Sequence, residues 1–278
     1  MARILIAGCG DVGCALGERL AAAGHEVWGL RRSAAALPPS IRPLVADLGE
    51  PESLRALPAG LDQVVYAAAP ARRTEDAYRA IYDAGLGHLI AALEAAGQTL
   101  RRLIFTSSTS VYDQRDGSWV DETSPAEAEG WNARHLRAGE ERVRAAPWPG
   151  VVVRFGGIYG PGRSRLIRRA HAGEPVQRRP PLWTNRIHRD DCAGVLAHLL
   201  AVERPAPLYL AVDDRPAPLA EVVDWICDQR GWPRPPALDW AAAEDRRRGG
   251  GKRCSNRLLR ASGYRFAYPD YRRGYRAL

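Results

Sequence analysis

Three glycines near the start of the chain have a spacing that can do specific chemistry. Gly8, Gly10 and Gly13 form Gly-x-Gly-x-x-Gly, directly after the apolar run Arg3–Ala7 and at the start of an expected helix, Val12–Ala23. Gly8 permits a tight turn, Gly10 lets the backbone approach a pyrophosphate, and Gly13 lets the helix pack closely on the strand. The helix that follows presents unpaired N–H groups and the positive end of its dipole. The pattern predicts a dinucleotide cofactor held by Gly8, Cys9, Gly10, Asp11, Val12 and Gly13.

The end of the next expected strand, Glu26–Leu30, indicates which dinucleotide is bound. NAD sites usually place an acidic residue here, which binds the ribose 2′-hydroxyl. This chain has Arg31, Arg32 and Ser33 instead, and two guanidinium groups with a hydroxyl suit a 2′-phosphate. Arginine is abundant elsewhere too, because Lys252 is the only lysine among 40 Lys and Arg residues. We expect NADP in preference to NAD.

Two further strand ends offer contacts to the same cofactor. Asp47 follows the expected strand Pro43–Ala46, where its carboxylate could bind the adenine amine or could instead cap a helix. The expected strand Gln63–Ala67 ends in small side chains that leave room for a cofactor to lie close. These are Ala67, Ala68 and Ala69.

The elements that must position these residues alternate along the first two thirds of the chain. Short apolar runs are typical of strands buried on both faces, and helices fall between them. The expected strands are Arg3–Ala7, Glu26–Leu30, Pro43–Ala46, Gln63–Ala67, Arg101–Thr106 and Val151–Arg154. The clearest helix spans Thr74–Ala96, with Thr74 as its N-terminal cap and Gly97 just past its end. We predict an α/β fold, a Rossmann-type doubly wound parallel sheet, with residues 1–155 as the NAD(P)-binding domain.

The composition of the chain changes after Arg154. Gly and Pro increase, and expected helices at Asp190–Val202 and Leu219–Arg230 lie among short extended pieces such as Leu208–Val212. We interpret residues 156–278 as a smaller C-terminal substrate-binding lobe, interleaved with the first domain. It would fold over the carboxyl edge of the sheet, where open α/β folds bind ligands.

Composition excludes several other classes of protein. No stretch approaches the roughly 20 apolar residues that a membrane span needs. The first residues run straight into a strand, so we expect no signal peptide and a cytoplasmic protein. The five cysteines are odd in number and lack Cys-x-x-Cys spacing, which argues against a metal site or a disulfide framework.

The formal net charge of +8 raises the question of nucleic acid binding. The densest basic runs, Arg246–Arg248 and Lys252–Arg253, flank a glycine triplet at 249–251 that we expect to be a mobile loop. The excess of arginine over lysine is more typical of codon bias than of a phosphate-binding surface. We expect no nucleic acid partner.

Four later stretches complete a family pattern in the family's own order: Phe105–Tyr112, Val120–Glu122, Arg154–Arg163 and Asn185–Asp191. Together with the glycine loop, they make the chain resemble the extended short-chain dehydrogenase/reductase superfamily, in particular its NAD-dependent epimerase/dehydratase branch. The resemblance covers most of the chain. It implies further cofactor contacts at Ser107, Phe155 and Gly156, and it allows a homodimer formed through paired helices.

One part of the family pattern is missing. The resemblance implies catalysis by Tyr-x-x-x-Lys and a Ser or Thr, in which the tyrosine exchanges a proton with the substrate and the lysine lowers its pKa. Ser108 matches the Ser or Thr. No Tyr-x-x-x-Lys occurs anywhere, because Arg248 stands four residues before Lys252, and Trp131–His135 occupies the expected place of the motif.

Three residues could replace the missing acid: Tyr112, Tyr159 and His135. A phenol near its usual pKa of about 10 is a poor base at pH 7 unless a cation is close, and Arg134 or His135 could supply one. Alternatively, His135 is a solvated helix residue and Tyr159 packs in a loop. In that case the protein would bind NADP without catalysing a reaction.

The resemblance also bears on the substrate. Thr109-Ser110 stands where dehydratases carry Asp-Glu, so we do not expect sugar 4,6-dehydration. Asn185, Arg186 and His188 could contact the substrate, or they could anchor the lobe while Asp190 caps the following helix. We predict an NADP-dependent oxidoreductase or epimerase for a small polar, sugar-like substrate. The alternative is a non-catalytic NADP-binding sensor or regulatory protein.

Overall fold

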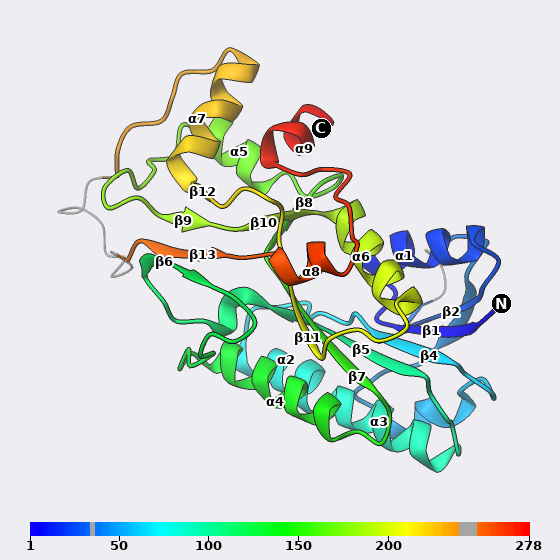
Figure 1. The fold of residues 1–278 in the computed structure, drawn as a ribbon. Coiled ribbons are helices and arrows are strands. Elements are labelled where there is room, and N and C mark those ends of the chain that lie inside the picture. Colours follow the sequence, from blue (N-terminus) through cyan, green and yellow to red (C-terminus); the bar gives the residue numbers. More distant parts are fainter. Residues whose placement is uncertain (34–36, 239–248) are drawn as a thin grey trace.

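A computed structural model of the protein has one central sheet of seven parallel strands (Figure 1). The structure describes residues 1–33, 37–238 and 249–278, so the basic run Arg246–Arg248 lies outside the described residues. The strands of the sheet are β1 (Arg3–Ala7), β2 (Glu26–Arg31), β3 (Arg42–Val45), β4 (Gln63–Tyr66), β5 (Arg102–Ser108), β7 (Gly150–Phe155) and β11 (Leu208–Ala211).

The order of the strands is β11-β7-β5-β4-β1-β2-β3. The chain winds outward from β1 to β3, then returns to pair β4 with β1 and winds the other way. This reversal beside β1 is the topological switch point at which open α/β sheets bind ligands. The doubly wound Rossmann fold predicted from the sequence is confirmed.

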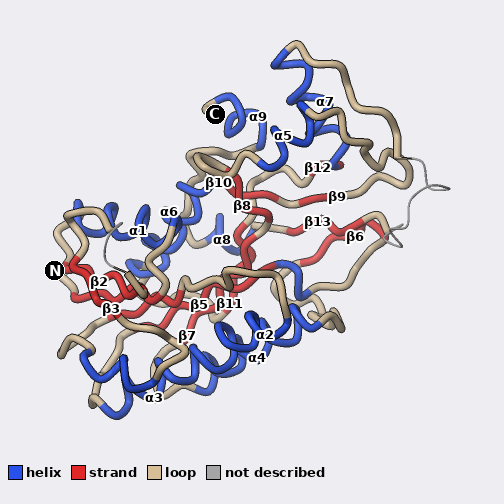
Figure 2. The backbone as a smooth tube through the Cα atoms, turned by 180° about the vertical axis from the view of Figure 1, so that it is seen from behind, coloured by secondary structure: helices blue, strands red, loops and turns tan. Residues whose placement is uncertain are grey.

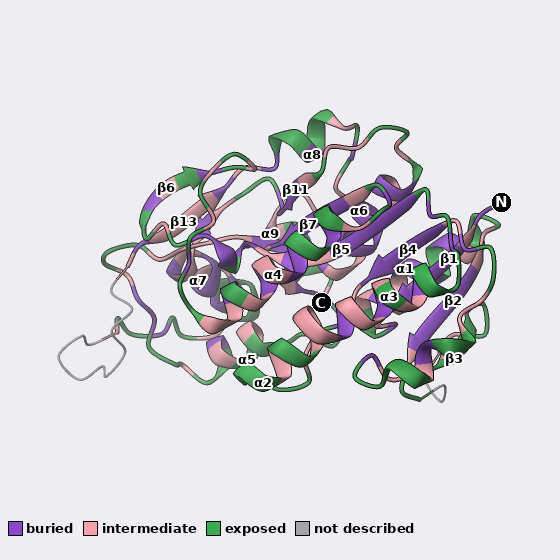
Figure 3. Cartoon of the chain, turned by 90° about the horizontal axis from the view of Figure 1, so that it is seen from below, coloured by how far each residue is buried: buried purple, intermediate pink, exposed green. Residues whose placement is uncertain are grey.

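Helices cover both faces of the sheet (Figures 1 and 2). On one face α1 (Asp11–Ala22) packs against α6 (Arg189–Ala201). On the other lie α3 (Leu86–Ala95) and α4 (Trp131–Ala145). Alternate residues of one strand serve the two cores, since Leu5 joins the α3 side and its neighbours Ile4 and Ile6 join the α1 side. The sheet is accordingly buried on both faces (Figure 3).

The predicted helix Thr74–Ala96 is three pieces in the structure. Thr74 caps α2 (Glu75–Tyr78) as predicted, and its hydroxyl oxygen accepts from the Ala77 N–H at 3.4 Å. A π-helix, η2 (Arg79–Gly85), then leads into α3. Apolar periodicity predicts a helix here, but it does not distinguish a π turn from an α turn.

The remaining elements form a smaller lobe beside the carboxyl edge of the sheet, plus short connecting turns. β10 pairs with β8 in parallel, and a four-stranded sheet runs β12-β9-β13-β6. The lobe has its own apolar cluster, which includes Val222 and Ile226 of α7. The elements are β6 (Asp116–Val120), β8 (Gly157–Tyr159), β9 (Trp183–Thr184), β10 (Arg186–His188), β12 (Ala217–Pro218), β13 (Gly251–Cys254), α5 (Arg165–His171), α7 (Leu219–Arg230), α8 (Arg257–Ala261), α9 (Tyr271–Arg276), and the 3₁₀ turns η1 (Pro51–Ala56) and η3 (Thr109–Val111).

The structure differs from the sequence expectation in three places within this part of the chain. β11 and α6, which we expected in the lobe, belong to the central sheet and its covering layer. Gly251, expected in a loop, begins β13, because β6 offers it a parallel partner more than 130 residues away in sequence. β6 itself comes from the first half of the chain, so the lobe is built from both halves. No helix in the described ranges is long and apolar enough to cross a membrane.

Candidate cofactor and active site

A single cavity of about 820 Å³ opens at the carboxyl ends of β1, β2, β3, β4, β5 and β7. Its volume is in the range of small-molecule and cofactor sites, roughly 300–1,000 Å³. All sixteen residues predicted to bind the cofactor line it: Gly8, Cys9, Gly10, Asp11, Val12, Gly13, Arg31, Arg32, Ser33, Asp47, Ala67, Ala68, Ala69, Ser107, Phe155 and Gly156. Residues far apart in sequence are therefore brought to one site.

The glycine loop has the close geometry that its spacing predicts. Gly8 has φ +87°, and a Cβ added to it would lie 2.2 Å from the Cα of Ala68. Its N–H donates to the Leu30 carbonyl at 3.0 Å, which ties the turn to β2. A Cβ on Gly13 would lie 2.9 Å from the Gly8 oxygen, whereas a Cβ on Gly10 would meet no neighbouring atom within 4 Å. The backbone at Gly10 thus faces open space that a pyrophosphate can fill.

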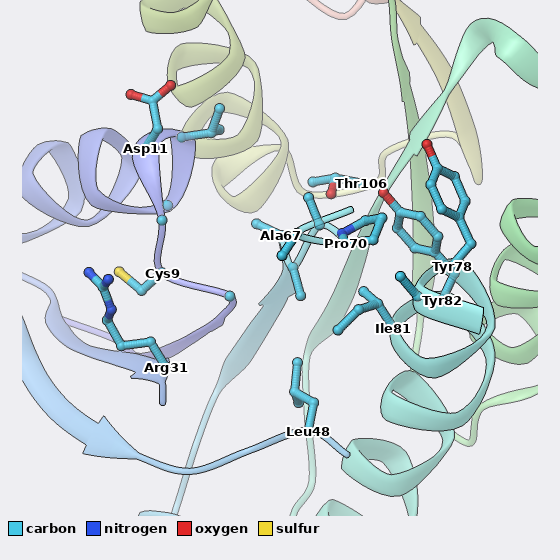
Figure 4. A pocket seen from close by; sticks show the side chains of 18 of the residues that line it. Cys9, Asp11, Arg31, Leu48, Ala67, Pro70, Tyr78, Ile81, Tyr82 and Thr106 are labelled. Carbon is cyan, nitrogen blue, oxygen red and sulfur yellow. The ribbon is translucent and has the colours of Figure 1, made fainter. Parts of the chain in front are cut away.

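The N-terminus of α1 faces this loop without a side-chain cap. Gly10 is its cap residue and has no side chain to accept from the first turn, so the positive end of the helix is available to an anion. The Asp11 carboxylate is turned away from the cavity towards α6 (Figure 4). It accepts from Arg163 Nε at 2.7 Å and from Arg189 Nη1 at 3.0 Å. Asp11 therefore ties the glycine loop to α6 and to Arg163 of the smaller lobe.

Arg31, Arg32 and Ser33 line the cavity where β2 ends, and Arg32 and Ser33 are exposed. Figure 4 shows the Arg31 guanidinium beside Cys9. Asp47 lines the cavity as well, and its Oδ1 accepts from the Gly49 N–H at 2.9 Å. That bond closes a tight local turn. The expectation that Asp47 could cap a helix is not met, because the cap of η1 is Glu50.

A buried polar network lies behind the cavity wall formed by β5 and β7. Glu140 of α4 accepts from Ser107 Oγ at 2.7 Å and from Arg154 Nε and Nη2 at 2.8 and 2.6 Å. Arg154 Nη1 donates to the Tyr112 hydroxyl at 2.7 Å, and that hydroxyl donates to the Asp121 carbonyl at 2.8 Å. Tyr112 does not line the cavity. Burial raises the pKa of Tyr112 to about 12, although Arg154 opposes this.

Ser108 is the one sequence-predicted catalytic candidate that lines the cavity. Its Oγ accepts from the Ser110 N–H at 3.1 Å, where it caps η3. That bond uses an oxygen lone pair, so the hydroxyl proton stays free to donate into the cavity. Ser108 can thus bind an oxygen of a ligand that lies over the ends of β5 and β7.

His135 lies on α4 outside the cavity lining. Its Nε2 is buried without a hydrogen bond and lies 3.7 Å from Glu75 Oε1. Arg134, expected to supply a cation to a tyrosine, donates to the same Glu75 at 3.1 Å. Trp131, which begins α4, packs its ring edge-on against Tyr78 with 4.9 Å between the centroids. The structure thus places neither a phenol nor an ammonium group on this part of α4.

The predicted substrate residues of the lobe are packed inside it and do not line the cavity. Asn185 Oδ1 accepts from the Cys254 N–H at 2.7 Å and its Nδ2 donates to the Lys252 carbonyl at 3.0 Å, so Asn185 anchors β13. Arg186 is buried in β10. Tyr159 is buried too, and its ring stacks on Tyr275.

His188, not Asp190, caps α6. Its Nδ1 accepts from the Asp190 N–H at 3.2 Å. Burial lowers the pKa of His188, which keeps the imidazole neutral and able to accept. The expected cap at Asp190 is wrong because Asp190 is already inside the helix, where its carboxylate accepts from Arg189 Nε at 2.7 Å.

Comparison with known proteins agrees with this geometry. The family model for NAD(P)H-binding proteins matches residues 8–203. The chain belongs to the NAD(P)H-binding family of epimerase/dehydratase-type short-chain dehydrogenases/reductases. The resemblance inferred from its motifs is confirmed.

Relatives extend over nearly the whole chain. A 3-diazoavenalumate denitrifying reductase from Streptomyces is 33% identical over 264 residues, covering 87% of this chain and 86% of the reductase. A structure assigned as an NAD-dependent epimerase/dehydratase from Methylobacillus flagellatus is 38% identical with a TM-score of 0.82, covering 100% of this chain and 97% of the other. A human epimerase family protein with NADPH shares the fold, with a TM-score of 0.78 at 22% identity over 98% and 97% of the two chains.

Two residues that sequence reasoning missed also line the cavity: Tyr78 and Tyr82. Tyr78 ends α2, and Tyr82 lies within η2. The available signal was their spacing of four residues on a predicted helix that follows a strand of the sheet. They come from a helical segment that packs beside α4, the helix on which the family motif places its tyrosine.

Proposed function

We propose that this protein is an NADP(H)-dependent oxidoreductase that works as a reductase on a small polar substrate. The observation that carries the proposal is the convergence of all sixteen predicted cofactor residues on one cavity. Open space at Gly10, the uncapped start of α1 and the basic end of β2 fit the pyrophosphate and the 2′-phosphate of NADP. When bound, the nicotinamide would supply the hydride.

The chain's own residues would orient that cofactor and its substrate. Arg31 and Arg32 would hold the 2′-phosphate, and the small side chains of Ala67, Ala68 and Ala69 would let the cofactor lie against β4. Ser108 would donate its free hydroxyl proton to a substrate oxygen. A reducing direction is favoured over epimerisation because a relative that covers most of this chain is named a reductase.

The preference for NADP can be tested by binding. A charge-assisted hydrogen bond is worth about 1.5–3 kcal/mol, which corresponds to roughly a 10- to 100-fold change in Kd. Arg32→Ala should weaken NADPH binding by this factor and leave NADH binding nearly unchanged, as measured by energy transfer from tryptophan to the reduced nicotinamide. Arg204→Ala is the matched control, because Arg204 is exposed before β11, at the opposite edge of the sheet.

Two results would count against the proposal. Equal affinity for NADH and NADPH in the unaltered protein would remove the preference for NADP. Absence of binding for both would remove the cofactor site itself. The missing Tyr-x-x-x-Lys supports one alternative, an NADP(H)-binding regulatory protein. Consumption of NADPH, followed at 340 nm with a panel of aldehydes and ketones, separates it from a reductase.

A further inference from the structure

Tyr78 and Tyr82 lie at and just after the junction between α2 and the π-helix η2. Within η2 the Ile81 carbonyl accepts from the Tyr66 hydroxyl at 2.6 Å, so a strand residue anchors the π turn from below. The rings of Tyr78 and Tyr82 meet edge-on, with centroids 5.3 Å apart. π segments are rare and often occur at functional sites. Here Tyr82 lies in the π segment, Tyr78 directly precedes it, and both residues line one cavity.

The hydroxyls of this phenol pair, Tyr78 and Tyr82, are not used by the protein. Neither has a hydrogen bond to any residue in the described part of the chain. Tyr78 and Tyr82 are half-buried, whereas the buried Tyr66, Tyr112 and Tyr271 all donate their hydroxyl protons to protein oxygens. A hydroxyl that lines a cavity and has no internal partner is available to a ligand.

Apolar side chains such as Pro70 and Ile81 line the cavity beside the phenol pair. Figure 4 shows Tyr82 directed towards Pro70 and Thr106, with Ile81 beside it and Arg31 far across the cavity. The arginines that line the cavity among the described residues are Arg31, Arg32 and Arg163, and Arg163 is held by Asp11 at the glycine loop. Such a site suits a neutral oxygen better than a carboxylate or a phosphate.

The phenols would act as proton donors at neutral pH. Burial raises the pKa of Tyr82, and the neighbouring Tyr78 raises it further. A phenol whose pKa is raised stays protonated, so it can donate a hydrogen bond to an oxygen that gains negative charge. The ring of Trp131 on α4 packs edge-on against Tyr78. Trp131 itself stands where the family pattern implies a tyrosine.

We propose that Tyr78 and Tyr82 bind the carbonyl oxygen of the substrate, a small aldehyde or ketone, and donate to it during reduction. This inference rests on the proposed function. NADPH would supply the hydride from a C–H bond of its reduced nicotinamide and would be left as NADP⁺. The two electrons of the hydride would form the new C–H bond of the substrate, and the π electrons of the C=O bond would move to the oxygen. The oxygen would take a proton from a phenol of the pair, and a solvent acid would then reprotonate the phenolate.

A binding experiment tests the phenol pair without turnover. Acetophenone and α-methylstyrene have nearly the same shape, but only the first carries a carbonyl oxygen. Ligand-observed NMR on the cofactor-free protein should show acetophenone binding about 5- to 10-fold more tightly, given the net value of a neutral hydrogen bond. The double variant Tyr78→Phe/Tyr82→Phe should lose this preference. An unaltered protein that shows no preference would overturn the proposal.

A kinetic experiment tests the role in reduction. The double variant should lower kcat with a ketone or aldehyde from the active panel by about 100-fold or more, while the Kd of NADPH stays within threefold. Tyr271→Phe is the matched control, since its hydroxyl donates to Glu221 in the lobe at 2.8 Å, away from the cavity. A double variant that folds, binds NADPH and keeps more than half of kcat would refute the phenol pair and leave the proposed function standing. Failure of the unaltered protein to bind NADPH would instead refute the proposed function.

Discussion

The buried carboxylate of Glu140 offers a quantitative test of how the β5 wall of the site is held. Glu140 and Arg154 have side chains only 1% and 5% exposed, and two hydrogen bonds of 2.8 and 2.6 Å join them. Glu140→Gln keeps the size of the side chain and removes its charge. Arginine stays protonated in proteins, so the Arg154 guanidinium would stay charged without its counterion. Because it is buried, water cannot compensate for that loss. Breaking a buried ion pair in this way costs about 3–5 kcal/mol.

The assay is equilibrium unfolding in urea, with the slope of the transition compared between variants. The matched control is Asp83→Asn, which breaks the ion pair between Asp83 of η2 and Arg142 of α4, the helix that also carries Glu140. There the side chains are 31% and 46% exposed, so the loss should stay below about 1 kcal/mol. Adding Arg154→Met to Glu140→Gln should recover part of the stability, because no buried charge then remains. A loss for Glu140→Gln no larger than that of the control would refute this reasoning.

Three further changes test other parts of the structure. Gly8→Ala should abolish NADPH binding and lower the melting temperature, because φ is +87° and the new Cβ would meet the backbone of Ala68; normal binding in titrations would contradict this geometry. Burial raises the pKa of Asp213 well above its usual value, so the folded protein favours the protonated carboxyl. The stability that this protonation contributes is complete below an ordinary aspartate pKa of about 3.9 and is lost as pH rises through the folded-state pKa. Asp213→Asn should therefore be more stable than the unaltered protein at pH 8 and equal to it near pH 4, and a difference independent of pH in thermal unfolding would argue against burial as the cause. Asn185→Ala should cost about 1–3 kcal/mol in urea unfolding, because it leaves the Cys254 N–H without its acceptor; a neutral effect would show that β13 does not depend on this side chain.

The sequence predicted most strands of the central sheet well because they are short apolar runs buried on both faces; the edge strand β3 is largely exposed. β1 has the predicted bounds, and β2, β4 and β5 differ from theirs by one or two residues at an end. The lobe was harder to predict, because its strands are short and depend on distant partners. β13 contains a glycine and two charged residues, and it becomes a strand because β6 and β9 lie on either side of it.

The same contrast explains which site residues could be read from the sequence. Gly8, Ala68 and Phe155 lie at strand ends, and the carboxyl ends of parallel strands meet at one edge whatever the side chains are. The orientation of a side chain such as Tyr112 depends on partners far along the chain, in this case Arg154 and the carbonyl of Asp121. No local pattern specifies those partners.

In the proposed function, separate parts of the fold would serve binding and chemistry. The cofactor side of the cavity is built from backbone turns and small residues, such as Gly10 and Ala67, which the topology brings together. The opposite wall is built from helices, whose exact winding decides which side chains reach the cavity. In a regular α-helix Tyr78 and Tyr82 would be about 40° apart around the helix axis, and the π turn changes that angle. A chain without a tyrosine on α4 would in this way present phenols from the neighbouring helical segment, while the glycine loop and the sheet stay unchanged.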